Sequence, residues 1–403
     1  MDEDRIPIPQ TYEEAVKHPV FGPKWREAIG LELQNLICFG TWEYVRRPVG
    51  RAVITCKWVF NVKYGSDGRL ERFKARLVAR GFSQREGLDF EDTFAPVIRL
   101  ESLRILFAIA ATYGLTAHLL DATNAFVGSK VDKEVYMELA EGLTDHGLGP
   151  TEPGQVCKIL QSLYGLRQSA NLWNQKVKNF VSTIGFRPST TNSSVFINDR
   201  GIIIALYMDD ILVFGKSTQD IEKVKDKLKG FHTMTDSGRV KKILGIRITW
   251  LPHGIKLDQE LYARQILEDF GMLSSKGRQL PMSPSTDLNQ ESPQLPKDLH
   301  SKFRHIIGRL TYLSGGTQLD IQFPVNQLSQ HLATPTKVHL EAAKRILRYI
   351  HQTIKYAITY LSGDKGSGIL VGYVDAAYGN ATKSRSTSGY IFVLAGGPVS
   401  WSS

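Results

Sequence analysis

Cysteine is scarce in this sequence, and the few cysteines present are not paired. Cys38, Cys56 and Cys157 are the three cysteines among 403 residues, and none has a Cys-x-x-Cys partner. This pattern excludes a disulfide framework and a cysteine-ligated zinc site, and it indicates a reducing compartment. No apolar run approaches the roughly 18 residues of a membrane span, and the acidic N-terminus lacks the pattern of a secretory signal. We therefore expect a chain without a secretion or membrane signal of its own.

The composition is that of a folded protein with a modest basic excess. Hydrophobic residues make up 42% of the chain and aromatic residues 10%, which excludes a disordered or fibrous chain. At roughly 150 residues per domain, the length predicts two or three domains. Lys and Arg number 50 against 40 Asp and Glu, so the net charge is +10. The excess is a bias rather than a basic tail, and it favours a polyanionic partner.

The first 80 residues predict an arm, a helix and a long basic hairpin. Four prolines lie within residues 1–23, and a helical pattern follows at 24–37. Residues 57–64 and 70–80 are strand-like and flank Asp67-Gly68, a strong turn signal. The residues expected to face outward are basic: Lys57, Lys63, Arg69, Arg72, Lys74, Arg76 and Arg80. A solvated face accounts for these charges as readily as a binding surface does.

The middle of the chain alternates between strand and helix patterns. A helix is expected at 100–113 with Gly114 as its left-handed cap, followed by a short strand at 116–120 that ends at Asp121. The other expected elements are strands at 156–160 and 243–250, helices at 171–184, 220–229 and 261–270, and an apolar hairpin at 201–214. This alternation indicates an α/β or α+β fold.

The last third of the chain reads as helices followed by strands. Residues 279–297 collect four prolines among polar residues and predict a linker. Helices are expected at 303–313 and 339–352, and strands at 369–374 and 390–394. The sequence stops at Ser403 within what looks like a third strand, so we expect an incomplete C-terminal domain.

Two adjacent carboxylates occupy the expected tip of the apolar hairpin. A tight turn would present Asp209 and Asp210 at one edge of a sheet, although an ordinary polar turn remains an alternative. Adjacent buried carboxylates repel unless a cation lies between them, and Asp121 could supply a third ligand. Carboxylates without nearby histidine or cysteine favour Mg²⁺ or Mn²⁺ over zinc. Two such ions can catalyse an in-line phosphoryl displacement.

Ten short segments along nearly the whole chain carry a family signature. They are Gly40–Glu43, Cys56–Phe60, Lys74–Phe82, Thr93–Val97, Asp121–Phe126, Val135–Glu138, Leu163–Gln168, Tyr207–Asp210, Leu244–Ile246 and Ala342–Tyr349. In this order they resemble the reverse transcriptase region of a copia-type long-terminal-repeat retrotransposon polyprotein. Gly372–Asp375 and Ser386–Tyr390 resemble the opening strands of the ribonuclease H domain that follows it in that family.

The resemblance implies a mixed α+β (α/β) fold, in which a right-hand polymerase with fingers, palm and thumb precedes the start of a ribonuclease H-like α/β domain. The implied parts are an N-terminal arm and helix at 1–39, fingers and palm with the start of the thumb at 40–278, a linker at 279–297, thumb or connection helices at 298–362, and a partial ribonuclease H-like domain at 363–403. Asp375 would be the first metal ligand of that last domain. The other ligands are expected beyond residue 403, so we expect no ribonuclease activity.

The implied activity is RNA-directed DNA synthesis from deoxynucleoside triphosphates on RNA and DNA template-primers. Asp121, Asp209 and Asp210 would be the catalytic residues and would bind two Mg²⁺ or Mn²⁺ ions, with Asp210 coordinating less directly. The implied nucleotide contacts are Lys74, Arg76, Phe126, Gln168, Tyr207 and Met208. The implied nucleic-acid contacts are Lys57, Lys63, Arg72, Leu244, Gly245, Lys344, Arg345 and Arg348.

Several of these residues have simpler explanations. Phe126 would exclude a 2′-hydroxyl in the family, but the residues alone favour a core phenylalanine at the start of a helix. Gln168 would contact the nucleotide, or it could be a solvated residue at a helix start. Trp173 is expected in the core rather than as a platform for base stacking. The basic face at 344–348 suits duplex phosphates and also suits solvent.

The chain departs from the family pattern at two places. Ser169–Leu172 stands where the family usually has a small residue and Pro-Arg, and Gln318-Leu319 stands where Arg-Pro is usual. Such drift leaves two alternatives open, a decayed remnant without an active product and a non-catalytic nucleic-acid-binding protein. The intact carboxylates and Phe126 argue against both. The family implies an intracellular location, in a cytoplasmic particle or the nucleus, and the oligomeric state is left open.

Overall fold

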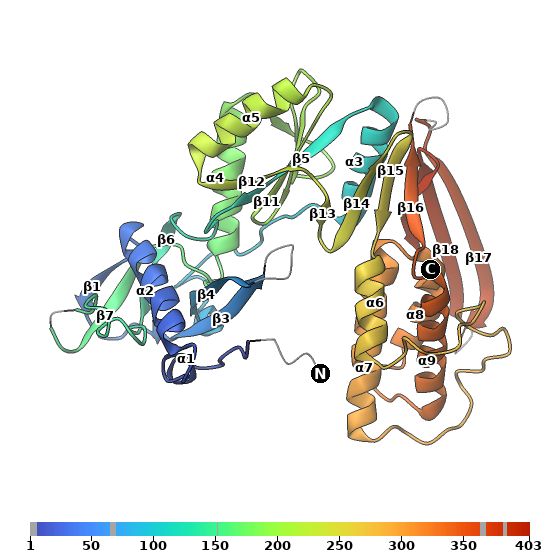
Figure 1. The fold of residues 1–403 in the computed structure, drawn as a ribbon, viewed down its shortest axis with the longest axis horizontal. Coiled ribbons are helices and arrows are strands. Elements are labelled where there is room, and N and C mark those ends of the chain that lie inside the picture. Colours follow the sequence, from blue (N-terminus) through green and yellow to red (C-terminus); the bar gives the residue numbers. More distant parts are fainter. Residues whose placement is uncertain (1–5, 65–69, 151, 363–367, 382–384) are drawn as a thin grey trace.

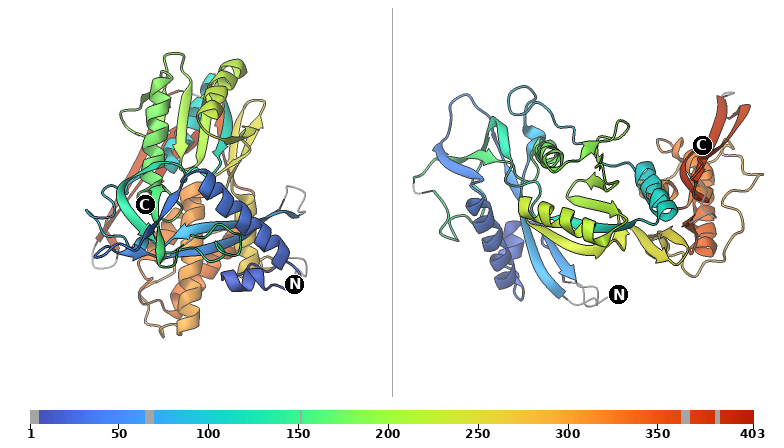
Figure 2. Two further views of the ribbon diagram at one scale, coloured as in Figure 1. Left: turned by 90° about the vertical axis from the view of Figure 1, so that its left-hand side faces the viewer. Right: turned by 90° about the horizontal axis from the view of Figure 1, so that it is seen from above.

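The computed structural model describes residues 6–64, 70–150, 152–362, 368–381 and 385–403. In Figure 1 the N-terminal elements lie on one side, the largest sheet lies at the top, and the C-terminal helices and strands lie on the other side. The view from above in Figure 2 shows the same order. One central sheet therefore separates the N-terminal and C-terminal parts of the chain.

The N-terminal part packs a helix onto a hairpin beside a small sheet. The helices are α1 (Tyr12–Val16), α2 (Gly22–Cys38) and the short η1 (Gly81–Ser83). The hairpin consists of β3 (Cys56–Tyr64) and β4 (Leu70–Ala79). The small sheet has the strand order β1 (Trp42–Arg46), β7 (Gln155–Gln161), β6 (Lys130–Met137), β2 (Val53–Ile54). Trp25 on α2 is fully buried between Phe60 and Phe73 of the hairpin, with ring centroids 5.2 and 4.7 Å away. The expected helix and basic hairpin are confirmed.

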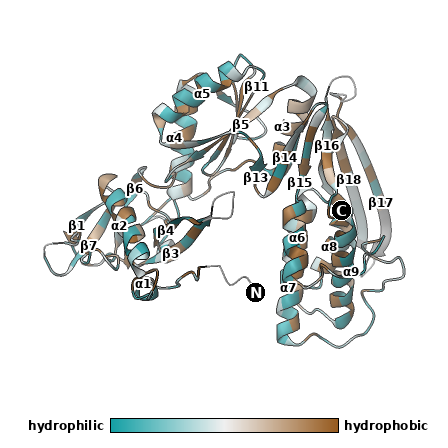
Figure 3. Cartoon of the chain, viewed as in Figure 1, coloured by the Kyte–Doolittle hydropathy of each residue, from teal (hydrophilic) through white to brown (hydrophobic). Residues whose placement is uncertain are grey.

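The central sheet is covered on both faces. Its strands run in the order β12 (Met234–Arg239), β5 (Thr116–Ala122), β11 (Asp210–Gly215), β10 (Ile203–Tyr207), β9 (Val195–Ile197), β8 (Arg187–Pro188). Ile211 and Val213 of β11 pack toward α4 (Ser169–Thr183) and α5 (Thr218–Phe231), while Leu212 and Phe214 pack toward α3 (Leu100–Tyr113). A strand buried on both faces needs a continuous apolar run, as β11 has. Figure 3 shows α5 mostly in the hydrophilic colour, because the helix is rich in charged residues, of which Lys225 is buried.

The C-terminal part combines a helical bundle with two small sheets. The helices are α6 (Glu260–Asp269), α7 (Lys297–Gly316), η2 (Leu319–Ile321), α8 (Gln322–Ser329) and α9 (Lys337–Thr353). One sheet has the order β13 (Lys242–Ile243), β14 (Ile246–Leu251), β15 (Gly254–Asp258), β16 (Ala357–Leu361), and the other the order β17 (Val371–Ala381), β18 (Arg385–Leu394), β19 (Gly397–Ser402). Residues 279–296, in the expected linker, form no helix and only one isolated bridge.

Arg104 on α3 connects the central sheet to the C-terminal part. This side chain is 2% exposed, and its Nε donates to the Val399 carbonyl at 2.8 Å. Its Nη1 donates to the carbonyls of Gly315 and Gly316 at the end of α7, and its Cζ lies 3.7 Å from the ring centroid of Trp401. A single buried cation thereby joins α3, α7 and β19.

Three local expectations from the sequence are wrong. Asp121 lies inside β5 rather than after it, because both neighbouring strands pair with this residue. Phe126 lies in a turn rather than at the start of a helix, and Asn124 before it has φ 56°. The strand expected at 243–250 is interrupted at Leu244 and Gly245, which both have positive φ. The Asp67-Gly68 turn and Arg69 lie outside the described residues.

Candidate active site at the β10–β11 turn

Three segments of the central sheet bring the predicted carboxylates together. β5 pairs with β11 so that Asp121 lies directly opposite Asp210. Directly opposed residues of antiparallel strands project from the same face, with Cβ atoms about 4.5–5.5 Å apart. Asp209 precedes Asp210 in the turn closed by the Tyr207–Asp210 pair, and the Ala122 amide donates to the Asp209 carbonyl at 2.9 Å. Residues far apart in the sequence thus meet at one edge of the sheet.

The turn that carries Asp209 has a strained backbone held by a buried tryptophan. Met208 has φ 54°, in the first central position of a two-residue turn, where a type II′ geometry favours glycine. Such strain costs of order 1–3 kcal/mol and persists when the surroundings enforce it. Trp173 on α4 donates its indole N–H to the Met208 carbonyl at 2.9 Å and is 2% exposed. Trp173 is a core residue, as expected, but its anchoring of the turn was not foreseen.

The carboxylates repel one another. The pKa of Asp210 is raised to about 6, first by burial and then by the charges of Asp209 and Asp121. The pKa of Asp121 is also raised, first by burial and then by Asp209, while three basic side chains of the β3–β4 hairpin lower it. The site therefore concentrates negative charge in a partly buried position, which a bound cation would stabilise.

The donor set fits a hard divalent ion. Three carboxylates offer only oxygen ligands, as Mg²⁺ and Mn²⁺ prefer. In the described part of the chain, no three His, Cys, Asp or Glu side chains already converge at metal-binding distances. Binding an ion would therefore draw the side chains of Asp121, Asp209 and Asp210 closer together than they stand here.

The β3–β4 hairpin presents a basic face. The register of the two strands puts five basic side chains on one face: Lys57, Lys63, Arg72, Lys74 and Arg76. None of them is ion-paired with a carboxylate among the described residues. Lys63 lies directly opposite Arg72, a like-charge pair that destabilises a hairpin unless an anion binds. The pKa of Lys74 is lowered, first by burial and then by Arg76, Arg72 and Lys63.

Phe126 lies at the margin of a core, beside the carboxylate edge. It is half-buried, packs against the cluster beneath α4 and α5, and meets Tyr164 edge-on with ring centroids 5.8 Å apart. The Cζ of Arg76 lies over the Tyr164 ring, 5.4 Å from its centroid. The structure therefore joins two predicted nucleotide contacts, Arg76 and Phe126, through Tyr164, a residue that sequence reasoning did not assign to the site.

Gln168 is buried away from solvent. It is 1% exposed, its Nε2 donates to the Asp89 carbonyl at 3.0 Å, and its Oε1 accepts from Gln84 at 3.1 Å. The expectation of a solvated residue at a helix start is therefore wrong. Both ends of the amide are used inside the protein, so the structure does not bring Gln168 into the cluster around Asp121.

The break between β13 and β14 is held by α7. Leu244 and Gly245 have φ 47° and 68°, and the Tyr312 hydroxyl on α7 donates to the Leu244 carbonyl. The positive φ of Gly245 favours glycine, and a Cβ there would also lie 2.6 Å from that hydroxyl oxygen. Burial raises the pKa of Tyr312, and Tyr262 and Tyr207 raise it further. Tyr312, which holds the 244–245 turn, is therefore within electrostatic reach of Tyr207.

The basic residues predicted on α9 are partly engaged by the protein itself. Lys344 pairs with Glu341 at 2.8 Å, and the Arg345 Nε donates to the Leu280 carbonyl at 3.2 Å. The backbone carbonyl of Arg348 accepts from the Arg278 amide at 3.3 Å. This face therefore supports the 278–280 segment as well as facing solvent.

Asp375 lies outside the central sheet. It is exposed on β17, opposite Gly389 of β18, and it lines a cavity of about 360 Å³ together with Tyr373, Tyr390 and Trp401. The structure does not place Asp375 in a carboxylate cluster among the described residues.

Comparison with known proteins gives the family. A family model described as reverse transcriptase (RNA-dependent DNA polymerase) matches residues 39–284. The Retrovirus-related Pol polyprotein from transposon RE1 of Arabidopsis thaliana is 37% identical over 98% of this chain, and that from transposon TNT 1-94 of Nicotiana tabacum is 33% identical over 98%. The chain spans 26% and 30% of the lengths of these relatives.

A solved foamy viral protease–reverse transcriptase in complex with double-stranded DNA is 14% identical, with a TM-score of 0.47, over 93% of this chain and 55% of that chain. The chain belongs to the reverse transcriptase family, among the copia-type retrotransposon Pol polyproteins. The resemblance seen in the sequence is thereby confirmed. The described part of the chain contains no helix long and apolar enough to cross a membrane.

Proposed function

We propose that this chain catalyses RNA-directed DNA synthesis from deoxynucleoside triphosphates on RNA and DNA template-primers. One observation carries the proposal: in a chain of the reverse transcriptase family, Asp121 and Asp210 lie in register, Asp209 adjoins them, and basic side chains of the β3–β4 hairpin reach Asp121 electrostatically. An anionic substrate would balance the positive charge of this hairpin face, and divalent cations bound with it would balance the negative charge of the carboxylates.

The residues divide the chemical work. Asp121, Asp209 and Asp210 would hold two Mg²⁺ or Mn²⁺ ions, which would lower the pKa of the primer 3′-hydroxyl and stabilise the pyrophosphate leaving group. Lys74 and Arg76 bind the triphosphate from the β3–β4 hairpin. The ring of Phe126 excludes a 2′-hydroxyl. Trp173 and the Ala122 amide hold the turn so that Asp209 stays oriented when the substrate binds.

The architecture supports a right-hand arrangement. The β3–β4 hairpin with α2 serves as fingers, the central sheet with α3, α4 and α5 as palm, and α6 to α9 as thumb and connection. The exposed faces of Lys57, Lys63 and Arg72 and the 244–245 turn contact the nucleic acid. β17 to β19, with Asp375, correspond to the opening strands of a ribonuclease H-like domain.

A non-catalytic or decayed chain explains the structure less well. The unusual residues at 169–171 are integrated into the fold, since the Ser169 hydroxyl donates to the Leu163 carbonyl at 2.6 Å and the Asn171 amide to the Phe94 carbonyl at 2.9 Å. The Gln318 amide likewise donates to the Thr353 carbonyl at 3.0 Å. These departures from the family pattern therefore leave the site's support in place.

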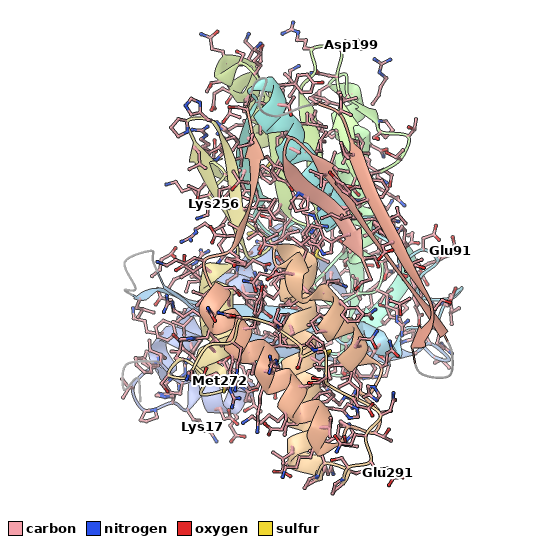
Figure 4. All side chains as sticks on the ribbon, turned by 90° about the vertical axis from the view of Figure 1, so that its right-hand side faces the viewer. Lys17, Glu91, Asp199, Lys256, Met272 and Glu291 are labelled. Atoms are coloured by element: carbon pink, nitrogen blue, oxygen red, sulfur yellow. The ribbon has the colours of Figure 1, made fainter. Side chains whose placement is uncertain are left out.

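The test is primer extension on an RNA template with Mg²⁺. We expect Asp209→Asn to lose at least about a thousandfold in rate while it still binds template-primer, because one anionic ligand is removed. Its thermal stability should hold or rise, since repulsion with the neighbouring carboxylates is relieved. Asp199→Asn is the matched control, because that exposed carboxylate projects from the surface at one end of the molecule (Figure 4) and pairs with Arg187. Extension by Asp209→Asn at the wild-type rate would show that the carboxylate assignment is wrong.

A further inference from the structure

Arg76, Tyr164 and Phe126 lie against one another near the carboxylates, and we call these three side chains the stack. The Cζ of Arg76 lies 5.4 Å from the ring centroid of Tyr164. The same ring meets Phe126 edge-on, with centroids 5.8 Å apart and planes at 88°. The three residues come from β4, from the loop before α4 and from the turn after β5. The stack therefore joins the basic hairpin to the ring assigned to sugar discrimination.

The backbone fixes Tyr164 beneath β4. The Ala79 amide donates to the Tyr164 carbonyl at 2.8 Å, and the Gly81 amide donates to the Gly165 carbonyl at 3.2 Å. Gly165 has φ 88°, and a Cβ there would lie 2.1 Å from the Ala79 carbonyl oxygen, so this approach requires glycine. Main-chain contacts, together with packing of the ring against the N-terminal hydrophobic cluster, therefore hold Tyr164 against the strand that carries Arg76.

Arg76 retains hydrogen-bonding capacity in this position. Its Nε is buried and has no hydrogen-bond partner among the described residues. A buried donor without a partner is costly, and an anionic ligand would satisfy it. The pKa of Tyr164 is raised chiefly by burial, while Arg76 lowers it and Asp209 raises it. The stack therefore lies within electrostatic reach of the carboxylate turn.

We propose that Tyr164 is a positioning residue that sets the nucleotide affinity and the sugar discrimination of this site. Its ring face holds the guanidinium of Arg76 flat, so that the unused N–H donors point to the triphosphate. Its ring edge supports Phe126 against displacement by a 2′-hydroxyl. Tyr164 acts through these two side chains, and its role rests on the proposed polymerase function.

The test compares three substitutions in single-nucleotide primer extension. Tyr164→Leu removes both ring contacts, and we expect the KM for the deoxynucleotide to rise about tenfold, with a smaller change in kcat. The ratio of kcat/KM for deoxynucleotide over ribonucleotide should fall as well. Tyr164→Phe keeps the ring and should restore both quantities. Tyr164→Met keeps most of the volume without an aromatic face and should behave like Tyr164→Leu.

The matched control is a second arginine–tyrosine stack outside the site. The Cζ of Arg51 lies 5.9 Å from the ring centroid of Tyr136 on β6. Tyr136→Leu breaks this stack and should leave KM and sugar discrimination at their wild-type values. Thermal melting shows whether each variant folds, and if Tyr164→Leu does not, the volume-keeping Tyr164→Met carries the comparison.

The outcomes separate this inference from the proposed function. A wild-type chain that extends no primer contradicts the polymerase function itself. A wild-type chain that extends primers, with folded Tyr164→Leu or Tyr164→Met variants that keep the wild-type KM and discrimination, contradicts the positioning role alone. A loss confined to kcat, or a Tyr164→Phe variant as impaired as Tyr164→Leu, also contradicts it, since neither follows from loss of the ring contacts.

Discussion

At the scale of single residues, Asp210 and Met208 show that the site stores unfavourable energy before any substrate arrives. Asp210 is held beside two other carboxylates, and Met208 has a backbone conformation that suits glycine. The indole of Trp173 and the pairing of β5 with β11 hold both in place. Such a site is preorganised to bind cations, because a bound ion offsets the repulsion between carboxylates that the fold holds together.

The charge of Asp210 makes the stability of the metal-free protein depend on pH. Its pKa is raised to about 6 by burial and by Asp209 and Asp121. A carboxyl with a higher pKa in the folded than in the unfolded chain stabilises the fold when protonated, and this contribution is lost as the pH rises from about 4 through 6. Asp210→Asn should remove this loss, which is worth about 1 kcal/mol after allowance for partial exposure. Urea unfolding of both proteins at pH 4 and pH 7 measures the difference.

Addition of Mg²⁺ provides a control for the comparison of the wild-type protein with Asp210→Asn. Adding Mg²⁺ at pH 7 should stabilise the wild-type protein more than Asp210→Asn, because the ion offsets the repulsion that the substitution has already removed. A stability difference between the two proteins that stays the same at both pH values would contradict the assigned shift.

At the scale of elements, the β3–β4 hairpin concentrates positive charge on one exposed face. We expect Lys57→Gln and Lys63→Gln each to weaken template-primer binding by a similar factor for every sequence. Each should also reduce the slope of log affinity against log salt by about 1, because each lysine releases one counterion from a phosphate. Binding titrations at several salt concentrations measure the slope.

Lys17→Gln is the control for the hairpin. Lys17 follows α1 as its C-terminal cap, pairs with Glu13 and is exposed (Figure 4), so its removal should leave the salt slope unchanged. An equal reduction of the slope by all three substitutions would show that the effect comes from net charge rather than from the hairpin face.

Helices and strands were predicted from the sequence more accurately than the contacts of individual side chains. The hairpin at 201–214 and the helix at 100–113 were foreseen because apolar runs and a glycine cap report on neighbouring residues. The contacts of Tyr164 and Gln168 could not be predicted, because their partner residues are distant in the sequence and come close only when separate segments pack together. Local pattern therefore located the carboxylate turn, and tertiary contacts decided which side chains surround it.

At the scale of the whole molecule, the central sheet is continuous with the C-terminal part through buried contacts. α3 packs against β16 and β19 as well as against the central sheet, and residues of all these elements share one hydrophobic cluster. The central sheet and the C-terminal strands should therefore unfold as one unit, because their residues share one hydrophobic cluster.

The substitution Arg104→Met tests whether the central sheet and the C-terminal strands unfold together. Arg104→Met keeps an unbranched apolar stem but leaves the Val399 carbonyl and the carbonyls of Gly315 and Gly316 without their donor. It also removes the cation over Trp401. Unsatisfied buried carbonyls and the lost stacking should together cost about 2–4 kcal/mol of unfolding free energy. Limited proteolysis should cleave the 395–403 region earlier than in the wild-type protein, because β19 loses its attachment to α3.

Arg187→Met is the control for this substitution. Its side chain is 75% exposed and pairs with Asp199 at the surface, so its loss should cost less than about 0.5 kcal/mol. Two separate unfolding transitions in the wild-type protein, or an Arg104→Met protein as stable as Arg187→Met, would show that the central sheet and the C-terminal strands are independent. A single transition whose midpoint is lowered by Arg104→Met means that they unfold together, because α3 and these strands share one hydrophobic cluster.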